Sequence, residues 1–197
     1  DYLNKGVSDR LDVWATHPDF NFYPAIKQLT LDLAASVFLG VPLGPEADRL
    51  NKAFADSVAA AIAVVRVPIP GTKFGRGVKG RKYIQVYLRN QVPARRDGNG
   101  EDMFTLLCQA TDEDGNRFTV DEIVDHMNFL MMAAHDTLTS SMTTMIHELA
   151  QHNEWQDTLR QECRSVGLSP NLLPYDKLDD LQMMEWAFKE TLRLNPP

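Results

Sequence analysis

Residues 129–145 place polar side chains where an apolar helix should continue. The segment reads FLMMAAHDTLTSSMTTM and begins as a buried helix. Asp136 and Thr137 follow the apolar residues, and further hydroxyls come after them. Aspartate is almost never fully buried unless it is paired. Carboxyl groups in such surroundings gather at functional sites, which makes Asp136 a candidate functional residue.

Helical spacing aligns six of these positions in one stripe. Alanine at 133 and 134 leaves space along the stripe, so a flat group could approach the helix backbone closely. Two structural alternatives stay open at this point. Alanines also let another helix pack closely, and a threonine within a helix often bonds back to the carbonyl four residues earlier. The stripe consists of Phe129, Met132, Ala133, Asp136, Thr137 and Ser140.

Two other motifs in the chain match known sites less well. GRGVKG at residues 75–80 fits the glycine pattern of a dinucleotide-binding loop, which needs a strand directly before it. Pro68 and Pro70 argue against that strand, so a basic surface loop is favoured and a dinucleotide-binding domain is the weaker alternative. HELAQH at residues 147–152 spaces its histidines five apart, whereas a helical zinc site needs four. We therefore predict no metal ligands in this chain.

Helical periodicity dominates the sequence, so the fold class is predicted to be mainly α. The longest helix is expected over 119–151, where Thr119 and Glu122 form a capping box. It would run roughly 50 Å and is apolar nearly all round between Met127 and Ala134, as in a helix through a large protein. Asn153 and Asp179 are predicted to cap the next two helices. The other helices are expected near 21–39, 45–65, 82–92 and 102–110, with a loop at 67–82.

Glu190 and Arg193 form an E-x-x-R pattern that is followed by L-x-P-P. Together with AAHDTLTSS earlier in the chain, this order of motifs resembles the cytochrome P-450 family of haem-thiolate monooxygenases. Ala133 to Thr137 would occupy the family's small-Gly-x-acid-Thr pattern, with Ala134 in place of the usual glycine. The segment DTLRQECRSV is also typical of the family.

The resemblance implies a partial cytochrome P-450 fold, in which a long central helix is surrounded by helices. The family's sheet regions and haem-ligand loop are missing from this sequence. Residues 1–197 are thus expected to be an interior segment of one larger monooxygenase domain, and residues 67–82 a lid over the substrate channel. The family's iron ligand is a cysteine in a loop rich in Gly and Phe. Neither Cys108 nor Cys163 has that context, so the ligand is expected outside this chain.

The same resemblance implies roles for residues of the long helix. Ala133, Ala134 and Thr137 would contact haem b, and Phe129, Met132 and Ala133 would border the substrate. Asp136 and Thr137 would relay protons, with Thr137 holding a water by a hydrogen bond in a local break of the helix.

Glu190 and Arg193 would be structural residues that hold the haem-binding core together. The whole enzyme would activate O2 and insert one oxygen atom into an apolar organic substrate, whereas this segment alone would be inactive. Its electrons would come from NAD(P)H through a ferredoxin or a flavoprotein reductase.

The composition narrows the range of partners and compartments. The net charge of −7 argues against nucleic acid, because phosphate binding needs a basic face. Two cysteines fit a reducing compartment, so a cytoplasmic location is expected, while membrane attachment is left open. The alternative function is a non-catalytic helical interaction module, in which Asp136 and the hydroxyls would pack against a partner.

Overall fold

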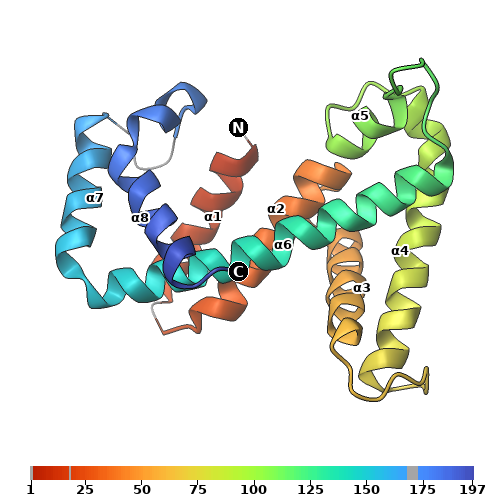
Figure 1. The fold of residues 1–197 in the computed structure, drawn as a ribbon, viewed down its shortest axis with the longest axis horizontal. Coiled ribbons are helices and arrows are strands. Elements are labelled where there is room, and N and C mark those ends of the chain that lie inside the picture. The colour runs from red at the N-terminus through yellow and green to blue at the C-terminus, as the bar shows by residue number, and fades with distance from the viewer. Residues whose placement is uncertain (1, 18, 168–172) are drawn as a thin grey trace. The chain divides into compact units, whose positions relative to one another are not determined.

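A computed structural model describes residues 2–17, 19–167 and 173–197 (Figure 1). Every regular element in those ranges is a helix, which confirms the predicted mainly α class. The first helix, α1, was not predicted from the sequence. No helix in the described ranges is both long and apolar enough to cross a membrane. The elements are α1 (Tyr2–Thr16), α2 (Phe22–Leu39), α3 (Pro45–Ala61), α4 (Lys73–Arg96), α5 (Met103–Gln109), α6 (Val120–Gln151), α7 (Asn153–Ser165), the 3-10 helix η1 (Tyr175–Asp180) and α8 (Gln182–Leu194).

The chain divides into two compact units. Residues 31–134 form the middle unit, and residues 1–30 with 135–197 form the terminal unit. α2 and α6 each begin in one unit and end in the other. That the whole chain belongs to one larger domain, as the sequence suggests, stays a prediction.

The core of the middle unit lies between α3, α4 and α5 and the parts of α2 and α6 that belong to this unit. Each of these helices has one apolar stripe that faces the others, as amphipathic helices do around a shared core. Fully buried members include Ala35, Leu50, Leu88, Phe104, Ile123 and Met127.

The first ten residues of α4 are helical, whereas the sequence analysis expected a loop up to residue 82. Thr72 caps the helix through its Oγ1, which accepts a hydrogen bond from the Gly75 amide at 3.0 Å. A Cβ atom on Gly77 would lie 2.1 Å from the Ala60 Cβ, and one on Gly80 would lie 2.4 Å from the Ala53 carbonyl oxygen. GRGVKG is therefore a close contact between α3 and α4, and the dinucleotide-loop alternative is wrong.

α4 also continues past Pro93, where the sequence analysis placed its end, and stops at Arg96. Tertiary contacts hold this last turn. The Arg95 guanidinium donates to the Leu39 carbonyl and to Asp102 Oδ1, the latter at 2.6 Å, and it lies over the Phe104 ring. These contacts offset the hydrogen bond that the proline cannot donate.

The helix starts were predicted with mixed success. The capping box is confirmed, because the Thr119 amide donates to Glu122 Oε2 at 2.8 Å and the Glu122 amide donates to Thr119 Oγ1 at 3.3 Å. Asn153 is not a cap but the first residue of α7. Asp179 lies in η1 instead of capping α8.

The cap of α8 comes from another helix. The Glu162 carboxylate on α7 accepts hydrogen bonds from the amides of Met183 and Met184 at 2.6 and 2.9 Å. A carboxylate also suits the positive end of the helix dipole. A local capping pattern could not reveal this partner, because it lies on a different helix.

Candidate active site

In the middle unit, α6 has a buried face and an open face. Ile123, Val124 and Met127 are fully buried against the core. Phe129 and Met132 lie outside this core, and their side chains are 62% and 50% exposed. Ala133 is exposed as well. The apolar start of the stripe is thus not used for packing within this unit, which leaves it open for a ligand.

Phe129 and Met132 line a groove between α6, α3 and α4. Its volume is about 380 Å³ and its lining is largely apolar. The sequence did not reveal that the helix bearing Phe54 and Val58 meets α6 here. Which helix faces meet depends on tertiary packing, which helical spacing alone does not determine. The other lining residues are Phe54, Ser57, Val58, Ala61, Arg81, Ile84, Asp125 and Asn128.

In the terminal unit, Asp136 lies between two basic side chains. Its Oδ1 is 3.0 Å from His135 Nδ1 and 3.6 Å from Lys27 Nζ on α2. The Asp136 side chain is 40% exposed, whereas that of His135 is fully enclosed. Burial lowers the pKa of His135, the charge of Asp136 opposes that shift, and Lys27 adds to it. The sequence did not indicate a role for His135 or Lys27.

Thr137 is exposed, and α6 is unbroken from Val120 to Gln151, so the local break expected at Thr137 is absent. Several of the neighbouring hydroxyls bond back along the helix. Thr139 Oγ1 donates to the His135 carbonyl at 2.8 Å, and Ser141 Oγ donates to the Thr137 carbonyl at 2.9 Å. Thr139 Oγ1 also lies 2.8 Å from Thr30 Oγ1 on α2. These bonds explain how buried hydroxyls are accommodated within the helix.

The two alanines on α6 suit a flat ligand. Ala133 is exposed and Ala134 is partly buried. A planar group that approaches α6 at Ala133 would meet only a methyl group before reaching the backbone. Small, exposed side chains at this position therefore fit a haem.

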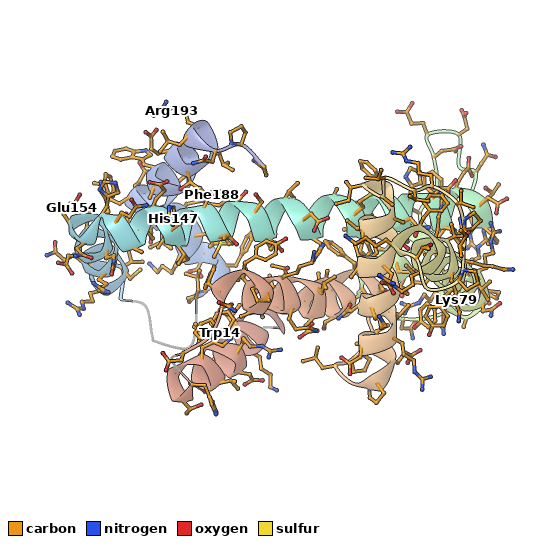
Figure 2. All side chains as sticks on the ribbon, turned by 90° about the horizontal axis from the view of Figure 1, so that it is seen from below. Trp14, Lys79, His147, Glu154, Phe188 and Arg193 are labelled. Carbon is orange, nitrogen blue, oxygen red and sulfur yellow. The ribbon has the colours of Figure 1, made fainter. Side chains whose placement is uncertain are left out.

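Glu190 and Arg193 form a two-pronged ion pair along α8. Arg193 Nε donates to Glu190 Oε2 at 2.7 Å, and Nη2 donates to Oε1 at 2.6 Å. The hydrogen bond from Arg193 lowers the pKa of Glu190, and the same bond raises the pKa of Arg193. Figure 2 shows Arg193 near the end of α8. Both side chains are exposed and can take further partners.

Other candidate metal ligands do not converge. His147 pairs with Gln151 at 2.9 Å, and His152 Nδ1 lies 3.3 Å from Glu154 Oε1. Across the described ranges, no three residues of the metal-binding types lie together. Cys108 is buried in the core of the middle unit, and this burial raises the pKa of its thiol.

Comparison with known proteins decides the family of this chain. The family model described as cytochrome P450 matches residues 8–197. The chain belongs to the cytochrome P450 family. Haem is the cofactor of that family, and the resemblance inferred from the α6 and α8 motifs is confirmed.

Similar cytochromes P450 extend well beyond the length of this chain. A putative cytochrome P450 136 of Mycobacterium tuberculosis is 42% identical over 90% of this chain, and the match spans 36% of that protein. A putative cytochrome P450 120 of Synechocystis is 26% identical over 97% of this chain and 43% of its own length. The solved structure of retinoic acid bound cyanobacterial CYP120A1 matches with a TM-score of 0.84 over 99% of this chain and 45% of that one.

Proposed function

We propose that this cytochrome P450 chain carries the helix beside the oxygen site of a haem-dependent monooxygenase. The enzyme would insert one atom of O2 into an apolar organic substrate. The open face of α6 supports this role most directly, because Phe129, Met132 and Ala133 are exposed although all three are apolar. Family membership favours this function over a non-catalytic interaction module.

Ala133, Ala134 and Thr137 would hold the haem against α6. Their side chains are small, so the ring could lie close to the helix. When bound and ligated by a thiolate, haem supplies oxygen binding and transfer. The role of this chain is to place that chemistry in an apolar pocket and to control water and protons there.

Asp136 and Thr137 would control the protons. The Asp136 carboxylate can accept a proton and release it, and the Thr137 hydroxyl can both donate and accept. Lys27 and His135 orient the carboxylate through Asp136 Oδ1. A carboxylate held in one position transfers protons more effectively than one that rotates freely, because the geometry is set in advance.

Phe129 and Met132 would contact the substrate from the apolar groove. A methionine adapts its shape to irregular ligands, and an aromatic ring offers a large apolar surface. The cyanobacterial relative was solved with retinoic acid bound, and another relative is described as a beta-amyrin 28-monooxygenase. We therefore propose that the substrate is an extended apolar molecule of the terpenoid class.

Electron supply, location and the ion pair of α8 complete the proposed function. Electrons would come from NAD(P)H through a ferredoxin or a flavoprotein reductase, and the enzyme would work in the cytoplasm. Glu190 and Arg193 would hold the haem-binding core together through their exposed ion pair.

Replacing Thr137 by alanine in the haem-containing protein tests the proton role. Product formed per NAD(P)H consumed should fall about tenfold, and hydrogen peroxide should rise, because protons would no longer reach the oxygen site in step with electrons. Thr143→Ala is the matched control, since Thr143 Oγ1 bonds back to the Thr139 carbonyl on the same helix. Equal product-to-NAD(P)H ratios in wild type and Thr137→Ala would refute the role.

A further inference from the structure

Arg81 lies on the side of the apolar groove that α4 forms. Among the described residues that line this groove, Arg81 is the single cation and Asp125 is the single anion. Arg81 is exposed, and its guanidinium forms no ion pair or hydrogen bond with any residue that the structure describes. A guanidinium presents its N–H donors in a planar fork, which matches the two oxygens of a carboxylate. The groove therefore offers an anion-binding group beside an apolar wall.

The groove lies in the angle between two helices that cross. α4 meets α6 where Arg89 pairs with Asp121, and the two helices run in different directions from there (Figure 1). Arg81 lies eight residues from Arg89 along α4. Phe129 lies eight residues from Asp121 along α6. A helix rises about 1.5 Å per residue, so Arg81 and Phe129 each lie roughly 12 Å from the crossing, along different arms of the groove.

The charge around Arg81 is positive although the whole chain is acidic. Residues 57–96 contain nine Lys and Arg and no Asp or Glu, whereas the net charge of the chain is −7. Lys79 (labelled in Figure 2) and Lys82 are exposed and form no ion pair with any residue that the structure describes. Asp125 lies on α6, four residues from the crossing, so it is nearer the crossing than Arg81 is. The α4 side of the groove therefore attracts anions.

We propose that the substrate is an apolar carboxylic acid whose carboxylate pairs with Arg81. This assignment rests on the proposed function and narrows its substrate from terpenoids in general to terpenoid acids. The carbon skeleton would follow the apolar wall of the groove, and the end remote from the carboxylate would lie near Met132 and Ala133. Arg81 would thereby determine which substrates bind and which end of the molecule faces the proposed haem site.

A single negative charge fits the groove better than none or several. A neutral molecule over Arg81 would remove water from the guanidinium without replacing its hydrogen bonds, which is unfavourable. A carboxylate replaces them with two charge-assisted bonds, which are stronger beside apolar side chains than in water. A diphosphate would bring more negative charge than one cation balances, in a groove that also contains Asp125. The groove volume of about 380 Å³ lies within the range of roughly 300–1,000 Å³ that is typical of ligand pockets.

Isothermal titration calorimetry on the haem-containing protein tests the pairing. The probes are farnesoic acid and farnesol, which share one isoprenoid skeleton and end in a carboxylate and a hydroxyl. Wild type should bind the acid about tenfold more tightly than the alcohol, because hydrogen bonds to charged groups are the stronger ones. Arg81→Gln should weaken binding of the acid about tenfold and leave binding of the alcohol unchanged. Arg81→Lys should fall between the two proteins, because lysine keeps the charge but lacks the planar fork.

Lys79→Gln is the matched control variant. Lys79 is an exposed cation on the same helix, but it does not line the groove. Its replacement should leave the dissociation constants of both probes unchanged, and circular dichroism should show the same helix content in every variant. Equal dissociation constants of wild type for the acid and the alcohol would overturn the proposal, as would no binding of the acid. Undiminished binding of the acid by Arg81→Gln would overturn it as well.

A separate assay distinguishes this proposal from the proposed function. Product formation is measured with the haem-containing protein, NAD(P)H and a redox partner. Oxygenated product from farnesol, together with no preference for the acid, would overturn the role of Arg81 and leave the monooxygenase function standing. Tight binding of the acid that depends on Arg81, without any product, would uphold the role of Arg81 and count against the monooxygenase function.

Discussion

Asp136 and His135 are neighbours in sequence but lie in very different surroundings. His135 is 1% exposed, whereas Asp136 reaches the surface and contacts Lys27. Helical geometry turns successive residues by about 100°, so one of them can face a neighbouring helix while the next faces outward. The acid that interrupts an apolar run is therefore accommodated by an ion pair, and the histidine before it takes the buried position.

The lowered pKa of His135 predicts a pH-dependent stability. Burial is the main cause, and the unfolded histidine titrates near 6.5. Below that pH the unfolded state binds more protons than the folded state does, so the free energy of unfolding should decrease as the pH falls below about 6.5. Above that pH the contribution of His135 to the free energy of unfolding is fully present and no longer changes.

Thermal melts at several pH values check this prediction. His135→Gln should weaken the fall in melting temperature between neutral pH and mildly acidic pH. His147→Gln serves as the control, because His147 is an exposed histidine on the same helix. An identical pH dependence in wild type and His135→Gln would show that another group is responsible.

The sequence was sufficient to single out Asp136 and Thr137, because polar residues in an apolar helix stand out without any structure. It could not identify Lys27, which lies on a different helix and carries no local pattern. It also gave no sign that His135 would be buried, since histidine occurs both inside proteins and on their surfaces.

The glycines at the start of α4 predicted a loop, whereas the structure has a helix there. A segment with several glycines favours a loop, because glycine is a poor helix former. Here Gly77 and Gly80 are buried in the contact with α3, where any larger side chain would collide with Ala60 or with the backbone of Ala53. The close packing of two helices outweighs the local preference, and only the partner helix reveals this.

Gly77→Ala should therefore destabilise the protein despite the better helix propensity of alanine. The new Cβ would lie 2.1 Å from the Ala60 Cβ, so α3 and α4 would have to separate. Overpacking of this kind typically costs about 1–3 kcal/mol. Urea denaturation would measure the loss, with Val78→Ala as the control because Val78 is exposed on the same helix. A Gly77→Ala variant as stable as wild type would mean that the two helices separate at little cost.

The ends of the helices show how far local rules extend. The Thr119–Glu122 box marked the start of α6 because both partners lie within four residues. The start of α8 could not be predicted in this way, because its cap is Glu162, which lies on α7. The local capping box of α6 was predictable, whereas the contact between α7 and α8 was not.

The motifs on α6 and α8 were enough to infer the family of the chain before any fold was known. The helical class and the extent of α6 were predicted correctly from periodicity and capping. The division into two compact units was not predicted, because it depends on how helices pack together. The chain spans 36% to 45% of the relatives and the solved structure described above. We propose that the face of α6 that is open here holds the haem of the family.

Filling the space at Ala133 tests whether the haem lies against this face of α6. Ala133 is exposed, so Ala133→Trp in the haem-containing protein should leave the helices intact but block the approach of a flat group to α6. We predict that haem bound per protein, measured by Soret absorbance, falls to near zero in Ala133→Trp. The same change at exposed Ala150, further along α6, should retain wild-type haem content. A full complement of haem with an unchanged Soret band in Ala133→Trp would contradict the placement of the cofactor on this face.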